Sequence, residues 1–150
     1  MNKTDKELIA PCGMYCGVCS SFLARKNDVK SKGVRAPYCA GCRASARKCA
    51  WLKKRCKPLL ENKIKYCFEC PSYPCVKLSH IDKRYRTLFH MSFIQNLDYV
   101  KNNGEEKFLK KIVKEWKCPK CGGAICCHNG VCYSCGIEKF KKKKKLYRWE

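Results

Sequence analysis

The sequence predicts a small, mostly helical α+β protein that is stabilised by bound metal, and three observations lead to this fold class. Cysteine accounts for 16 of the 150 residues, far more than an ordinary globular domain contains. The cysteines form two groups, at residues 12–75 and 118–135, with none between them. A chain of this length buries only a modest core, so cross-links must supplement that core.

The first residues favour metal over disulfides as the cross-link. Residues 1–7 are polar and charged, no apolar run of signal-peptide length follows them, and no stretch approaches the ~18 apolar residues of a membrane span. We therefore expect a cytoplasmic protein without membrane contact. Its thiols would stay reduced and available to metal.

The C-terminal cysteines have the spacing of a zinc ribbon over residues 118–137. Two C-x2-C pairs are separated by ten residues, and two intervening residues let both sulfurs of a pair face one point, as tetrahedral zinc requires. The predicted ligands of this ion are Cys118, Cys121, Cys132 and Cys135.

Two other features of this segment bear on the ribbon. Gly122 and Gly136 directly follow the second cysteine of each pair, where a positive φ would close the turn. Cys126, Cys127 and His128 lie between the pairs and exceed the four ligands required. Packing in the interior is the simpler interpretation of these three residues, with a ligand exchange or a second metal as the alternative.

The ten cysteines of the N-terminal module, residues 1–78, suffice for two further zinc sites, or about three zinc ions per chain. The first predicted ligand set is Cys16, Cys19, Cys39 and Cys42. The second is Cys56, Cys67, Cys70 and Cys75. Cys12 and Cys49 remain as candidates for additional ligands, and Cys49 competes with Cys56.

An iron–sulfur cluster is the alternative cofactor in this module. Cys12-x3-Cys16-x2-Cys19 has the spacing by which radical S-adenosylmethionine enzymes hold an open [4Fe–4S] cluster. The chain is too short for the barrel of those enzymes, and Val18 stands where they usually carry an aromatic residue. A plain [4Fe–4S] cluster with one more thiol, in an accessory redox protein, therefore remains the alternative to zinc.

Residues 79–117 predict a helical hairpin that connects the two cysteine groups. A turn signal ends at Gly104, and apolar residues recur with helical spacing on both sides of it. The residues of the second stripe are Phe108, Leu109, Ile112, Val113 and Trp116. Farther upstream, Pro58 is expected to interrupt a helical stretch at residues 46–64.

The charge of the chain points to a polyanionic partner. The sequence has 34 Lys and Arg against 12 Asp and Glu, a net charge of +22. Each tetrathiolate zinc site contributes −2, so three sites leave about +16. Such a charge attracts nucleic acid, although a solvated lysine-rich surface would have the same composition.

Residues 138–150 are expected to form a flexible basic tail that contacts nucleic acid, RNA rather than DNA. Lysines can follow phosphates while the aromatic side chains stack on unpaired bases. The predicted contact residues are Lys141, Lys142, Lys143, Lys144, Lys145, Tyr147, Arg148 and Trp149.

The sequence carries no recognisable catalytic pattern. We find no Ser-His-Asp order, no phosphate-binding glycine loop and no paired carboxylates. We therefore expect a non-catalytic protein. A protein-interaction adaptor, in which zinc presents loops to a protein partner, is the alternative to nucleic-acid binding.

Several motifs together resemble one prokaryotic family. They are Cys-Gly-Met-Tyr-Cys-Gly-Val-Cys at residues 12–19, Cys-Ala-Gly-Cys-Arg at 39–43 and Cys-Phe-Glu-Cys-Pro-Ser-Tyr-Pro-Cys at 67–75. Residues 96–104 and 116–122 fit its longer members. The chain is similar over most of residues 10–136 to the family known as domain of unknown function 3795. The resemblance implies an intracellular zinc-binding protein and supplies no activity or substrate.

Overall fold

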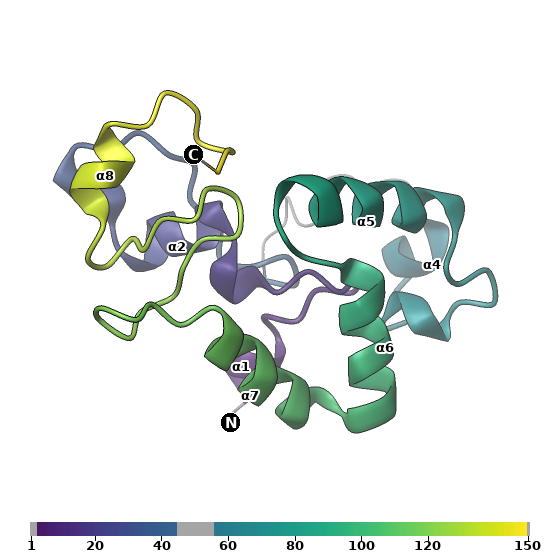
Figure 1. The fold of residues 1–150 in the computed structure, drawn as a ribbon. Coiled ribbons are helices and arrows are strands. Elements are labelled where there is room, and N and C mark those ends of the chain that lie inside the picture. The colour runs from purple at the N-terminus through teal and green to yellow at the C-terminus, as the bar shows by residue number, and fades with distance from the viewer. Residues whose placement is uncertain (1–2, 45–55, 150) are drawn as a thin grey trace.

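The computed structural model describes residues 3–44 and 56–149 (Figure 1). The α-helices of this part are α1 (Lys3–Lys6), α2 (Ser20–Lys26), α4 (Lys57–Leu60), α5 (Val76–Leu88), α6 (Phe93–Asn103), α7 (Glu105–Glu115) and α8 (Ile137–Lys141). Its 3-10 helices are η1 (Cys16–Val18), η2 (Val29–Lys32) and η3 (Cys67–Glu69). In the described residues, β-pairing is confined to isolated bridges, so the predicted helical character is confirmed.

The predicted helical hairpin is present as α6 and α7. Ser92 directly precedes α6 and caps it: its hydroxyl accepts a hydrogen bond from the Gln95 N–H (3.1 Å), a common N-terminal cap. Gly104 joins the two helices at φ +89°. The apolar stripe of α7 faces inward, with Phe108, Leu109 and Ile112 buried.

The hairpin is extended by α5, which crosses the boundary expected between residues 78 and 79. Its buried side includes a carboxylate, Asp82, which hides the apolar periodicity that would have indicated a helix. The Asp82 carboxylate accepts hydrogen bonds from the Ser92 hydroxyl (2.8 Å) and the Ile94 N–H (3.0 Å). These bonds fix the start of α6 against α5.

Only the end of the stretch expected to be interrupted at Pro58 lies in the described residues, where Cys56 is extended and α4 begins at Lys57. Pro58 lies in the first turn of α4, where the missing N–H removes no helical hydrogen bond. Residues 45–55, with Cys49, lie outside the described part of the chain.

Two apolar clusters connect segments that are distant in sequence. The larger joins residues 9–18 to α5, α6 and α7, and it also contains Cys127 from the C-terminal cysteine segment. The smaller joins α2 and residues 29–36 to Val131, Tyr133 and Phe140. Both clusters therefore cross the expected module boundaries.

The C-terminal segment, expected to be a flexible tail, packs back on the molecule in this structure. Residues 137–141 form α8, and Phe140 is buried. The Trp149 indole N–H donates a hydrogen bond to the Cys127 carbonyl (2.6 Å), and the Asn129 amide donates one to the Leu146 carbonyl (2.9 Å). The C-terminus consequently lies near residues 127–130 and not away from the body (Figure 1).

Candidate metal centre

The four cysteines of the C-terminal motif converge on one point. The sulfurs of Cys118, Cys121, Cys132 and Cys135 all lie within 4.8 Å of one another. The Cys118–Cys135 sulfur separation is 3.7 Å and the Cys121–Cys132 separation is 3.5 Å. A tetrahedral ion with Zn–S bonds of about 2.3 Å needs sulfur separations of about 3.8 Å. The group can therefore hold one metal ion without rearrangement of the backbone.

Short-range backbone contacts set this geometry. The Gly122 N–H donates to the Cys118 carbonyl (2.9 Å), and the Gly136 N–H donates to the Cys132 carbonyl (2.7 Å). The Gly123 N–H also points at the Cys121 sulfur (3.3 Å). Each pair is therefore closed by a turn of its own, and isolated bridges pair the segments between them.

The two glycines that follow the pairs serve different purposes. Gly122 adopts φ +76°, as its position in the turn predicts. Gly136 has φ −109°, so the expectation of a positive φ there was wrong. A Cβ on Gly136 would lie 2.7 Å from the Cys132 carbonyl oxygen. Glycine is required at this position because the backbone passes too close for a side chain.

The thiols of this group differ in acidity. Hydrogen bonds from the backbone N–H groups of Cys121 and Lys120 lower the pKa of Cys118 to about 6. Hydrogen bonds with the neighbouring thiols, first that of Cys121, raise the pKa of Cys135 to about 12. One thiolate thus forms readily, and a cation is required before all four sulfurs can be anionic together.

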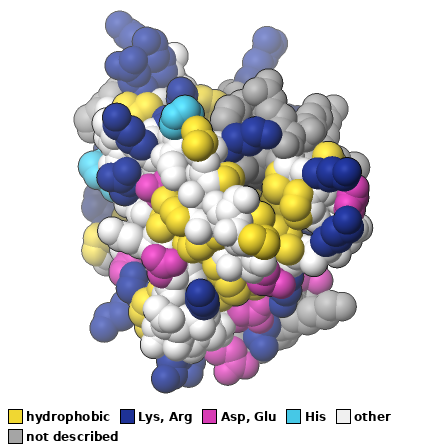
Figure 2. Space-filling view, turned by 90° about the vertical axis from the view of Figure 1, so that its right-hand side faces the viewer, with side chains coloured by type: hydrophobic (Ala, Val, Ile, Leu, Met, Phe, Trp, Pro, Cys, Tyr) yellow, Lys and Arg dark blue, Asp and Glu magenta, His cyan; other side chains and the backbone are white. Residues whose placement is uncertain are grey.

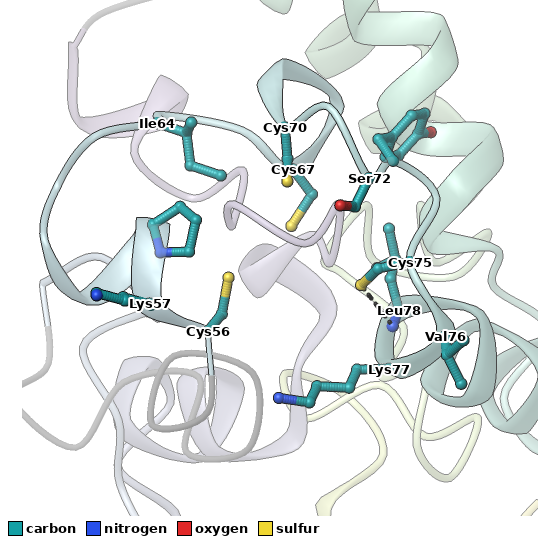
Figure 3. A pocket seen from close by; sticks show the side chains of 12 residues that line it. Cys56, Lys57, Ile64, Cys67, Cys70, Ser72, Cys75, Val76, Lys77 and Leu78 are labelled. Carbon is teal, nitrogen blue, oxygen red and sulfur yellow. Dashed lines mark hydrogen bonds between the residues drawn. The ribbon is translucent and has the colours of Figure 1, made fainter.

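The second predicted ligand set surrounds a cavity of about 390 Å³. Cys56 precedes α4, Cys67 begins η3 and Cys70 follows it. Cys75 caps the start of α5, where its sulfur accepts the Leu78 N–H (3.4 Å). All four sulfurs face the same space (Figure 3). On the side of the molecule formed by α4, α5 and α6, hydrophobic side chains gather, with both basic and acidic side chains around them (Figure 2). Among described residues, only the C-terminal group has three or more ligand atoms within 4.8 Å, so these sulfurs converge less closely.

The first predicted ligand set is only partly brought together. The Cys42 N–H donates to the Cys16 sulfur (3.3 Å), which places the two motifs side by side. The Cys39 sulfur instead accepts the N–H of Gly41 within its own turn (3.4 Å). Cys12 is buried in the larger apolar cluster with Cys16, and Cys19 and Cys42 pack against that cluster.

Thiols of the larger cluster, and others packed against it, lie near enough to Tyr85 to affect its ionisation. Burial, together with the charges of nearby thiolates, raises the pKa of Tyr85; the contributing residues are Cys127, Cys19, Cys12 and Cys42. Burial and the neighbouring Cys16 likewise raise the pKa of Cys19 to about 12. Burial also raises the pKa of Cys127. The thiols of Cys19 and Cys127 therefore favour the neutral form until a cation joins them.

His128 uses both ring nitrogens for contacts within the protein. Its Nδ1 accepts the Ser20 N–H (3.2 Å), so the proton sits on Nε2, which faces the Tyr85 hydroxyl at 2.9 Å. Burial lowers the pKa of His128 to about 4. The ring is thus a neutral link between α2, α5 and the C-terminal cysteine segment.

The basic C-terminal residues line a groove that the sequence did not predict. A cavity of about 280 Å³ lies between residues 33–35 and the segment from the end of α8 to Leu146. Its cationic side chains are Arg35, Lys141, Lys143 and Lys144. Arg35 is about a hundred residues away from the lysines along the chain, and no local sequence signal connects them.

The described cysteines form no disulfides, and none of the described helices has the length and apolar character of a membrane span. A sequence model of the family described as "Protein of unknown function (DUF3795)" matches residues 8–80. Residues 8–80 belong to this family. The DUF3795 region contains both N-terminal cysteine sets and ends within α5. No curated protein and no solved structure matches the chain.

Proposed function

We propose that this chain is a non-catalytic protein that binds zinc at three thiolate sites and binds nucleic acid through its basic C-terminal segment. The observation that carries the metal assignment is the convergence of four sulfurs at Cys118, Cys121, Cys132 and Cys135. Four thiolates at tetrahedral spacing favour zinc. In this proposal residues 118–137 are a zinc ribbon.

The two other sites lie in the N-terminal module. Cys56, Cys67, Cys70 and Cys75 are proposed to close around a second ion, and the support is that they face one cavity. Lys57 and Lys77 also line this cavity, and they would offset the −2 charge of a tetrathiolate zinc site. A third ion is assigned to the thiols near Cys16, because the Cys16 sulfur accepts the Cys42 N–H, and Cys19 and Cys42 pack against the apolar cluster that contains Cys16.

Elemental analysis and an absorption spectrum of protein purified without oxygen test the metal assignment. The expected result is a colourless solution with about three zinc ions per chain. Iron with sulfide and a broad band near ~400 nm would replace zinc with a cluster in the N-terminal module, using Cys12, Cys16 and Cys19. A protein with no thiolate-bound metal would refute the proposal.

The nucleic-acid assignment is supported by the net charge of +22 and by the groove that contains Arg35. Its cationic side chains approach from two segments, an arrangement suited to a phosphate backbone. Lys142 and Lys145 belong to the same lysine run but do not line the groove. Tyr147 is 46 % exposed and is the aromatic side chain proposed to stack on a base. RNA is preferred because its single-stranded regions expose bases to such stacking.

Binding of a single-stranded RNA, measured at several salt concentrations, tests this assignment. We expect affinity to fall steadily with added salt. Replacing Arg35 and Lys144 with serine should weaken binding about tenfold more than the same replacement of Lys142 and Lys145, which removes equal charge. Equal losses, or binding that ignores salt, would contradict the assignment. Absence of binding at low salt, with one protein recovered after nuclease treatment, would favour the adaptor function.

A further inference from the structure

Two adjacent cysteines of the C-terminal segment lie in different environments. Cys126 and Cys127 are both fully buried. Cys126 belongs to the smaller apolar cluster with Tyr133. Cys127 belongs to the larger cluster together with Cys12 and Cys16. Of the two, Cys127 is therefore the one placed among the N-terminal thiols.

Backbone and side-chain bonds hold Cys127 beside the Cys16–Cys19 turn. Its N–H donates to the carbonyl of Val18 (2.9 Å), a residue between the two cysteines of that turn. The adjacent His128 accepts the Ser20 N–H (3.2 Å), one residue beyond the turn. The indole N–H of Trp149 fixes the Cys127 carbonyl from the other side (2.6 Å). Contacts on both sides thus hold the residue in place.

Cys42 reaches the same turn from a third segment. Its N–H donates to the Cys16 sulfur (3.3 Å), and its side chain packs against the larger cluster, as does that of Cys19. Cys39 differs, since it belongs to neither apolar cluster. Its sulfur accepts a hydrogen bond from Gly41 in its own turn.

We propose that Cys127 completes the N-terminal metal site with Cys16, Cys19 and Cys42, in place of Cys39. Binding releases four thiol protons and forms one tetrathiolate centre around a soft divalent ion such as zinc. The four sulfurs have to move closer, because no three of them lie within 4.8 Å of one another in the described structure. The inference rests on the proposed metal binding and assigns the ligands of one site.

His128 is a positioning residue for this centre and not a ligand. Both of its ring nitrogens already face the Ser20 N–H and the Tyr85 hydroxyl. The imidazole therefore holds Cys127 over the Cys16–Cys19 turn. The site would join residues 8–80 to a ligand from outside the matched family region.

Three single variants test the assignment, each purified without oxygen and measured for metal per chain. Cys127→Ser should lose about one equivalent of zinc, because serine does not replace a thiolate ligand. Cys126→Ser is the matched control, equally buried and adjacent, and it should keep the wild-type content. Cys39→Ser should also keep it.

Cobalt substitution provides a second readout. Wild-type protein should show the sulfur-to-cobalt absorption of three tetrathiolate sites, and Cys127→Ser should lose about a third of it. Loss of metal from Cys39→Ser, or full retention by Cys127→Ser, would overturn the inference. If Cys127→Ser does not fold, the metal content of Cys39→Ser alone tests the inference. Wild-type protein without metal would instead refute the proposed function itself.

Discussion

The C-terminal cysteine group and the N-terminal module place their thiols in different ways. In the C-terminal group, four sulfurs from residues 118–135 already lie within 4.8 Å of one another. In the N-terminal module, thiols from several segments face a cavity or share the apolar core. No three of the described N-terminal sulfurs come that close.

The difference follows from the range of the contacts that fix each thiol. The C-terminal pairs are closed by hydrogen bonds within four residues, such as Gly122 to Cys118 and Gly136 to Cys132. Local turns close N-terminal pairs as well, as the Cys19 N–H to the Cys16 carbonyl (3.0 Å) does. Those pairs, however, are held to the rest of the module by contacts across the chain, such as the Cys67 N–H to the Pro11 carbonyl (2.9 Å). We infer that local sequence is enough to bring the C-terminal sulfurs together, and that metal binding completes the N-terminal sites.

The largest expected effect is that of metal removal. A strong chelator with reductant should unfold the N-terminal module, because structural zinc contributes on the order of 10 kcal/mol and a small domain has only about 5–15 kcal/mol of stability. Circular dichroism should lose helical signal and the cooperative thermal transition, and added zinc should restore both. A cooperative transition that survives verified metal removal would contradict this prediction.

A smaller effect, confined to the C-terminal group, is expected for Gly136→Ala. The new Cβ would lie 2.7 Å from the Cys132 carbonyl oxygen, and relieving such crowding costs about 1–3 kcal/mol. A chelator titration should remove one metal ion at about tenfold lower chelator concentration and leave the others unchanged.

Gly123→Ala is the control for this variant. Its Cβ would meet the Ser134 hydroxyl at 2.9 Å and the Cys121 sulfur at 3.3 Å. Both are side-chain atoms that can shift by a few tenths of an ångström, whereas the Cys132 carbonyl belongs to the backbone. If Gly123→Ala loses its metal ion at the same chelator concentration as Gly136→Ala, crowding of the Cys132 carbonyl is not the cause of the weaker metal binding.

The smallest effect is expected for Asp82→Asn, a substitution on the buried side of helix α5. Burial opposes ionisation of Asp82, but hydrogen bonds from Ile94, Ser92 and Arg86 outweigh it and lower its pKa. Loss of the charge should cost about 1–2 kcal/mol in thermal unfolding of the metal-bound protein. Metal content of the C-terminal group should not change. An unchanged unfolding midpoint would show that this network does not stabilise α5 against α6.

The part of the fold that the sequence predicted depends on short spacings. The four C-terminal cysteines, and the α6–α7 hairpin around Gly104, follow from two-residue gaps and helical periodicity. Both patterns are visible within about twenty residues. The sequence did not predict helix α5, because Asp82 occupies its buried side. A buried carboxylate breaks the apolar pattern by which a helix is recognised.

By itself, then, the sequence determined which cysteines form C-x2-C pairs, where helices α6 and α7 run and how basic the chain is. The tertiary structure decided which distant residues meet. It brought the Cys127 N–H to the Val18 carbonyl and the Trp149 indole N–H to the Cys127 carbonyl. It also brought Arg35 into the same groove as Lys144. The physical reason is that these contacts join segments about 20 to 110 residues apart. Packing of two shared cores brings such segments together, and no local propensity encodes that packing.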